Sequence, residues 1–222
     1  MRIPLARRVL DENDRSAEAL RKRFADAGLL VVNLMGSPGA GKTSLVEETI
    51  RRVAGRFRVG VLEGDIATSL DADRISRLGA PVVQINTGGA CHLDARMIGK
   101  ALECLDVSSL DVLLIENVGN LVCPAQFDLG ETVRAVVCSL PEGDDKVAKY
   151  PGMFSLADSV VLNKLDLAEY LEFDLALFRR TLAEVNADAE LIEVSCSTGA
   201  GCGKWLEWLE SKLSHGQAGD CG

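Results

Sequence analysis

The chain has 222 residues, 47% of them hydrophobic, and its 33 acidic and 24 basic side chains give a formal net charge of −9. This length predicts one globular domain with a substantial core, and the acidic balance argues against nucleic acid as principal partner, because phosphate binding needs clustered Lys and Arg. No apolar run reaches about 18 residues and the N-terminus lacks the apolar core of a signal peptide, so we expect no membrane span and a cytoplasmic protein.

Residues 1–28 precede the first predicted core strand and contain one predicted helix. This helix starts near Asn13, which is a typical capping residue, and ends before Gly28. It either covers the sheet of its own domain or serves as a docking helix for a partner. We expect residues 29–213 to form the main domain and residues 214–222 to form a flexible tail.

The first predicted strand, residues 29–35, runs into a glycine-rich loop that leads into a predicted helix over residues 44–53. The loop fits the phosphate-binding pattern G-x-x-x-x-G-K-[ST], in which glycines let backbone N–H groups wrap an anion at the start of a helix. Lys42 is predicted to reach the β- and γ-phosphates, and the Thr43 hydroxyl is predicted to bind Mg²⁺. The predicted phosphate-binding residues are Gly36, Ser37, Gly39, Ala40, Gly41, Lys42, Thr43 and Ser44.

Two further predicted strands lead into acidic side chains. Strand 58–62 is followed by Asp65, and strand 112–116 ends at Glu116 in the Walker B position. Because ligands bind at the carboxyl edge of α/β sheets, both acids are candidates for holding Mg²⁺ or the attacking water, and with the loop lysine they are the predicted catalytic residues. A helix-capping role is the alternative for Asp65. Gly119 is predicted to offer its N–H to the γ-phosphate.

Three soft ligands follow the third and fourth predicted strands. Cys91 and His92 come after strand 81–85, and Cys123 lies seven residues after Glu116. Thiolate and imidazole suit Zn²⁺ and Ni²⁺. Since a closed zinc site uses four ligands, the metal would exchange or be shared between two protomers. Unrelated buried thiols are the alternative, because the spacing is not a standard zinc pattern.

An N-K-x-D motif at Asn163, Lys164 and Asp166 follows another predicted strand. The Asp166 carboxylate is placed to accept hydrogen bonds from the guanine ring N–H and exocyclic amine, which adenine does not match. After the last predicted strand, Ser195 and Cys196 lie where a guanine-binding loop adds donors. The motif therefore predicts a guanine nucleotide.

Strands and helices alternate along the whole chain up to the last predicted helix at residues 204–213. The remaining predicted strands lie at residues 134–138, 159–162 and 191–194. This alternation predicts an α/β P-loop NTPase fold, a doubly wound, mostly parallel sheet with helices on both faces.

Several of these segments resemble the HypB family of hydrogenase nickel-incorporation GTPases, between residue 9 and about residue 213. The segments that carry the resemblance are residues 9–15, 33–43, 63–65, 87–94, 116–124 and 163–166. The resemblance implies a dimeric, metal-dependent GTPase that uses GTP, GDP and Mg²⁺ and helps to deliver nickel during [NiFe]-hydrogenase maturation. It also implies Ni²⁺ or Zn²⁺ on Cys91, His92 and Cys123 at the dimer interface, docking of the nickel metallochaperone HypA, and the hydrogenase large-subunit precursor as a partner.

Two other functions fit parts of the sequence. A urease-type nickel GTPase shares the P-loop and N-K-x-D motifs, but its Cys-Pro-His ligand motif does not occur here. A metal-storage or interaction module would bind its nucleotide only as a structural ligand. Neither a water-orienting glutamine after the Walker B strand nor an arginine finger is recognisable, so we expect slow hydrolysis.

Overall fold

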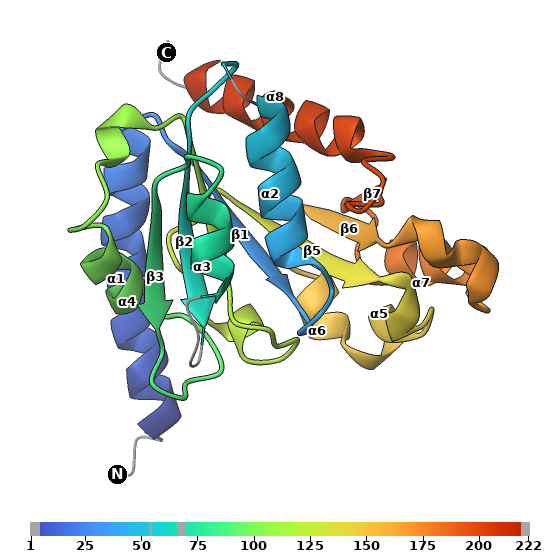
Figure 1. Ribbon diagram of the computed structural model, residues 1–222. Coiled ribbons are helices and arrows are strands. Elements are labelled where there is room, and N and C mark those ends of the chain that lie inside the picture. Colours follow the sequence, from blue (N-terminus) through green and yellow to red (C-terminus); the bar gives the residue numbers. More distant parts are fainter. Residues whose placement is uncertain (1–4, 54, 66–69, 219–222) are drawn as a thin grey trace.

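The computed structural model describes residues 5–53, 55–65 and 70–218, and its centre is a seven-stranded parallel sheet (Figure 1). The strand order is β3-β2-β4-β1-β5-β6-β7, so the direction of strand addition reverses beside β1. The strands are β1 (Leu30–Gly36), β2 (Val59–Asp65), β3 (Val82–Asn86), β4 (Val112–Glu116), β5 (Val133–Ser139), β6 (Ser159–Asn163) and β7 (Glu190–Glu193).

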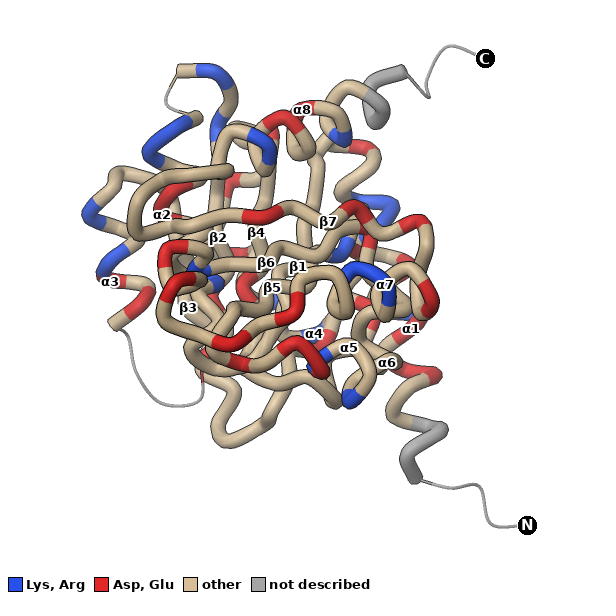
Figure 2. The backbone as a smooth tube through the Cα atoms, turned by 90° about the vertical axis from the view of Figure 1, so that its right-hand side faces the viewer, with Lys and Arg blue, Asp and Glu red and all other residues tan. Residues whose placement is uncertain are grey.

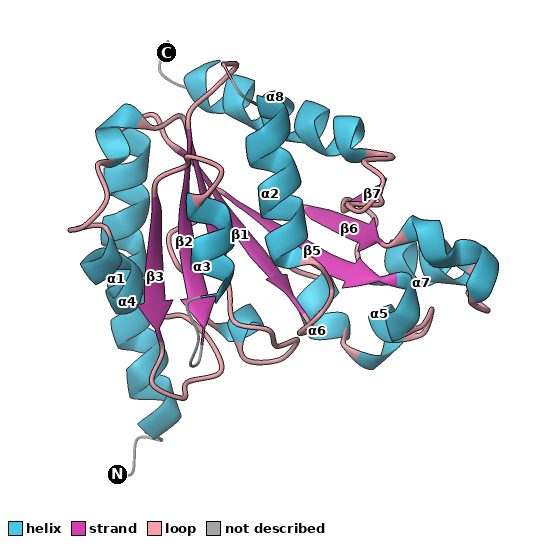
Figure 3. Cartoon of the chain, viewed as in Figure 1, coloured by secondary structure: helices cyan, strands magenta, loops and turns pink. Residues whose placement is uncertain are grey.

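Helices cover both faces of this sheet, which confirms the predicted fold class (Figure 3). The α-helices are α1 (Leu5–Asp26), α2 (Lys42–Val53), α3 (Leu70–Ser76), α4 (Ala95–Ala101), α5 (Lys146–Lys149), α6 (Pro151–Phe154), α7 (Leu175–Val185) and α8 (Cys202–Ala218). Short 3₁₀ segments occur at Val107–Ser109, Pro124–Gln126, Leu140–Glu142 and Leu165–Tyr170.

The alternation of side chains along β1 explains the two layers. Leu30, Val32 and Leu34 belong to the buried cluster that includes α2 and α8. Val31 points to the opposite face and packs in the cluster that includes α1 and α4. Successive residues of a strand face opposite sides, and a strand that is buried on both faces must be apolar throughout. The sheet therefore fixes the ends of its strands rigidly beneath the loops that follow them.

Helix α1 is longer than its sequence predicted. The predicted start near Asn13 is wrong, because the helix already includes Leu5. The Asn13 side chain does not start α1; its amide donates to the Asp128 carbonyl at 2.8 Å, and its oxygen accepts from the N–H of Ala95, the first residue of α4, at 2.9 Å. With Phe24 buried in the core, α1 covers the sheet of its own domain. A docking role for this helix stays a prediction.

The end of the chain also differs from the prediction. Helix α8 continues to Ala218, so its predicted end near residue 213 is wrong; residues 214–218 of the predicted tail are helical, and the flexibility of the tail stays a prediction. The rest of that predicted tail lies outside the described residues. The sequence predicted this helix from its spaced apolar residues alone, and backbone hydrogen bonding continues past the end of that apolar pattern.

None of the helices in the described parts of the chain is long and apolar enough to cross a membrane. Figure 2 shows acidic positions gathering around α5 and the segment that leads into α7. Among them are Asp144, Asp145 and Asp174. Basic side chains are more numerous near α2 and α3, where Arg51 and Arg74 form ion pairs with Glu47.

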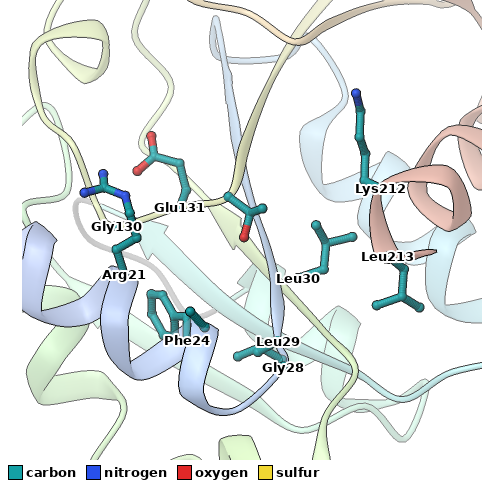
Figure 4. Close-up of a pocket in the computed structure, with 11 residues that line it drawn as sticks. Arg21, Phe24, Gly28, Leu29, Leu30, Gly130, Glu131, Lys212 and Leu213 are labelled. Carbon is teal, nitrogen blue, oxygen red and sulfur yellow. The ribbon is translucent and has the colours of Figure 1, made fainter. Parts of the chain in front are cut away.

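A cavity of about 360 Å³ opens at the amino-terminal edge of the sheet, between α1, the start of β1 and α8 (Figure 4). Its charged side chains contact other groups of the chain: Arg21 bonds to Asp128 and Glu18, Glu131 bonds to Arg134, and the Lys212 ammonium lies over the Trp208 ring. The residues that the sequence singled out all lie toward the other edge, where the strands end.

Candidate nucleotide and metal site

The loop between β1 and α2 needs glycine at two positions, for its backbone conformation at both and for close packing at Gly41. Gly39 and Gly41 have φ angles of 75° and 99°, a region that favours glycine. A Cβ atom on Gly41 would lie 2.2 Å from the Asn163 amide nitrogen. A Cβ atom on Gly119 would lie 2.8 Å from the Pro38 side chain. Three loops, after β1, β4 and β6, therefore meet at one point above the sheet.

These loops enclose a cavity of about 510 Å³ at the carboxyl edge of the sheet. Nine of the predicted site residues line it: Gly39, Gly41, Lys42, Thr43, Ser44, Asp65, Glu116, Gly119 and Lys164. The Lys42 ammonium donates to the carbonyls of Gly36 and Ser37 at 3.3 and 3.2 Å, so these two residues hold the lysine. Burial lowers the pKa of Lys42. Ala40 is fully buried behind the loop.

Thr43 and Glu116 meet at the floor of this cavity. The threonine hydroxyl donates to Glu116 Oε1 at 2.8 Å, and Asp65 lines the same cavity from the end of β2. Glu116 is only 5% exposed, and its other oxygen, Oε2, has no hydrogen-bond partner within the described residues. Burial raises the pKa of this carboxyl to about 7. Oxygen ligands with a free lone pair in a buried position fit a hard cation such as Mg²⁺.

The sequence reasoning missed Glu63. This residue lies in β2 directly beside Glu116 of β4, it is 3% exposed, and it lines the same cavity. The only signals were an acid near the end of a mostly apolar strand and its place in segment 63–65, which carries part of the family resemblance. The importance of Glu63 depends on strand register, which the sequence alone does not reveal. Arg74 also lines the cavity, with its guanidinium bonded to Glu47 and Asp71.

A second cavity of about 400 Å³ adjoins the first and contains the predicted guanine-binding residues. The Asp166 carboxylate accepts a hydrogen bond from the Ser195 hydroxyl at 2.5 Å, and this bond lowers the pKa of Asp166. Ser195 is 1% exposed and does not line the cavity, so it orients the carboxylate. Cys196 lines the cavity beside Asp166.

Asn163 and Lys164 tie this second cavity to the phosphate-binding loop. The Asn163 amide donates to the Ala40 carbonyl at 3.1 Å, and its oxygen accepts from the Cys196 N–H at 3.1 Å. Lys164 has a positive φ of 63°, which turns its side chain back so that the ammonium donates to the Gly39 carbonyl at 2.7 Å. The two cavities are therefore parts of one connected site.

The three soft ligands come together on the neighbouring loops. Ligand atoms of Cys91, His92 and Cys123 all lie within 4.8 Å of one another, and the two sulfur atoms are 2.9 Å apart. The His92 ring stacks on Phe127 with centroids 3.8 Å apart. Burial lowers the pKa of His92 and so favours the neutral imidazole that binds metals. The hydrogen bond with Cys91 raises the pKa of Cys123.

Asn120 connects this cluster to the phosphate-binding loop. Its backbone N–H donates to the Gly36 carbonyl at 3.0 Å. Its side-chain oxygen accepts from the N–H groups of Val122 and Cys123, at 2.8 and 3.4 Å. One residue thus touches both the loop that would hold the phosphates and the loop that carries a metal ligand.

Comparison with known proteins agrees with this geometry. A family model described as "CobW/HypB/UreG, nucleotide-binding domain" matches residues 30–193. The hydrogenase maturation factor HypB of Azotobacter vinelandii is 50% identical over 202 residues, which cover 91% of this chain and 67% of the relative. The chain belongs to the HypB family.

Two solved HypB structures have the same fold. HypB from Archaeoglobus fulgidus superposes with a TM-score of 0.86 and 42% identity, covering 91% of this chain and 99% of that chain. HypB from Helicobacter pylori in complex with nickel superposes with a TM-score of 0.88 and 38% identity, covering 92% and 96%. The HypB-type domain matched by the family model contains every predicted site residue except Ser195 and Cys196, which lie just beyond it.

Proposed function

We propose that this chain is a metal-regulated GTPase that binds Ni²⁺ or Zn²⁺ and assists nickel delivery during [NiFe]-hydrogenase maturation. The observation that carries the proposal is the contact of both sites with one residue: Asn120 bonds to the phosphate-binding loop at Gly36 and to the metal-ligand loop at Cys123. A conformational change that follows the γ-phosphate at Gly119 would therefore reach a metal ligand four residues later.

The residues of the first cavity would each bind a different part of the nucleotide or its metal ion. Lys42 would leave the carbonyls that it now contacts and bond to the phosphates, and the Gly119 N–H would face the γ-phosphate. Thr43, Asp65 and Glu116 would hold Mg²⁺, which neutralises charge that develops on the phosphates. Asp166 would accept from the guanine base, with Ser195 holding its orientation.

The soft ligand set supports nickel or zinc as the second metal. Two thiols and one imidazole leave at least one coordination position for a ligand from outside the chain. Val122, beside Cys123, is 54% exposed, so the cluster lies next to an exposed apolar side chain that a second protomer would cover. We infer a homodimer that shares the metal, receives nickel from the metallochaperone HypA and acts on the hydrogenase large-subunit precursor. The nickel complex of the H. pylori relative supports nickel as the bound metal.

The test is phosphate release on mixing the full chain with GTP and Mg²⁺. We expect slow turnover by the wild type, because a site without an arginine finger is slower than a fully equipped one by factors up to about 10⁵. A Lys42→Ala variant should lose nucleotide affinity and turnover together. Wild-type turnover by that variant would refute the site. Absence of release by the wild type would favour a storage module with a structural nucleotide.

A further inference from the structure

Three carboxyl groups project from one face of the sheet at the floor of the nucleotide cavity. Glu63 and Asp65 are two residues apart on β2, so both side chains lie on the same face. Glu116 on β4 is the register partner of Glu63, and all three residues line the cavity. Lys42 is the nearest buried cation, and its ammonium bonds to two backbone carbonyls.

Two of these carboxyl groups are buried and incompletely bonded. Glu63 and Glu116 are 3% and 5% exposed, and Oε2 of each has no hydrogen-bond partner among the described residues. A buried carboxylate is costly unless a cation or donors satisfy it. Arg74 cannot supply that charge in this arrangement, because Glu47 and Asp71 occupy its guanidinium.

Glu63 lies one strand farther from the phosphate-binding loop than Glu116, and it lies two residues before Asp65, the last residue of the same strand. Neighbouring strands are about 4.8 Å apart, whereas Mg²⁺–oxygen bonds are about 2.1 Å long. Since the Thr43 hydroxyl, on the Glu116 side, marks the cation position, Glu63 is placed to reach water molecules around the ion. Mg²⁺ normally keeps several waters, and these waters need acceptors.

We propose that Glu63 is a positioning residue for the divalent cation: its free carboxylate oxygen accepts hydrogen bonds from Mg²⁺-bound water, and this allows the site to bind Mg²⁺ before the nucleotide arrives. The inference rests on the proposed function only for the location of the cation, held by Thr43, Asp65 and Glu116. Glu63 fixes the side of the hydration shell that faces away from the phosphates. The Mg²⁺ ion would then already be in place to receive the incoming phosphates.

The experiment measures divalent-cation binding to the full chain without nucleotide. Mn²⁺ titration by calorimetry gives the affinity, and thermal unfolding in EDTA or in Mg²⁺ gives the stabilisation. Both ions prefer oxygen ligands, so the thiol cluster does not interfere. The variant is Glu63→Gln, which keeps the side-chain shape. The matched control is Glu131→Gln, another buried glutamate, which lies at the amino-terminal edge of the sheet.

We expect the wild type and Glu131→Gln to bind the cation equally, and Glu63→Gln to bind it at least about tenfold more weakly, as is typical for loss of an outer-shell partner. In EDTA, Glu63→Gln should be at least as stable as the wild type, because it removes a buried carboxyl group that no cation neutralises. A purely structural role predicts the opposite: lower stability in EDTA and unchanged cation affinity.

Two results would overturn the inference. One is nucleotide-free wild type that binds no Mg²⁺ or Mn²⁺, and this outcome needs no variant. The other is equal affinity in the wild type and Glu63→Gln, or in Glu63→Asp should the glutamine variant fail to fold. If the affinity falls as expected but no variant or wild type releases phosphate from GTP, the inference holds and the proposed hydrolysis fails.

Discussion

Replacing Asp166 by asparagine changes the hydrogen-bonding pattern of the guanine cavity without changing its size. The carboxylate has one oxygen on the Ser195 hydroxyl at 2.5 Å, and that bond keeps the pKa of Asp166 low, so the group is ionised at neutral pH. Guanine offers it two donors. The asparagine side chain has one accepting oxygen and one donating NH₂ group, so one guanine donor would face another donor and lose its hydrogen bond.

The expected loss follows from these contacts. Hydrogen bonds to charged groups are worth roughly one to two decades in affinity. Asp166 is exposed without nucleotide, so water competes for its oxygens and the lower end applies. We expect GDP to bind Asp166→Asn about tenfold more weakly. Xanthosine diphosphate, which has a carbonyl where guanine has its amine, should bind more tightly than it binds the wild type.

The assay is calorimetric titration of both nucleotides into the wild type, Asp166→Asn and Glu169→Gln. The last variant is the matched control, because Glu169 is an exposed acid on the same 3₁₀ segment, Leu165–Tyr170. It should bind both nucleotides as the wild type does. Unchanged GDP and xanthosine diphosphate affinities in Asp166→Asn would remove Asp166 from the base-binding cavity.

Two further predictions concern the metals. Cys123→Ser should weaken Ni²⁺ binding by at least about tenfold in a titration read by d–d absorption, because a hydroxyl replaces a soft thiolate. The control is Cys104→Ser, at an exposed thiol outside the cluster, which should bind Ni²⁺ as the wild type does. The second prediction concerns the pH dependence of stability in EDTA. In the folded chain the pKa values of Glu63 and Glu116 are about 8 and about 7, above the ordinary 4.5, so the folded chain binds more protons than the unfolded chain. The free energy of unfolding should therefore fall as pH rises from about 5 to 8. Urea midpoints should fall over that range in the wild type and fall less in Glu63→Gln; parallel pH profiles would contradict the assignment.

The motifs with local chemistry were predictable from the sequence. The phosphate-binding loop needs glycine at Gly39 and Gly41 because both have positive φ angles. A parallel strand that is covered on both faces must be apolar. Both features can therefore be recognised in the sequence. The close approach of Cys91, His92 and Cys123 could be suggested but not shown, because it depends on how the loops after β3 and β4 fold together across β2, which separates these two strands in the sheet.

What the sequence could not predict depends on tertiary contacts. Asn13 is a residue type that often starts helices, yet its side chain bonds to two other segments and helix α1 continues through it. Glu63 could be recognised as a site residue only from the strand register, which places it beside Glu116. Asn120 is one polar residue among several in its loop until its bonds to Gly36 and Cys123 are known. In each case at least one decisive partner is far away in the chain.

The measurement that tests the account most directly is Ni²⁺ affinity in the presence of GDP and of a non-hydrolysable GTP analogue. If the γ-phosphate moves Gly119, the segment through Asn120 moves Cys123, and the two affinities must differ. Linkage then requires Ni²⁺ to change nucleotide affinity by the same factor, typically 5- to 150-fold. Light scattering on the same samples should show a dimer fraction that follows nucleotide and metal together. Equal Ni²⁺ affinities, with a dimer fraction indifferent to both ligands, would contradict coupling of the two sites.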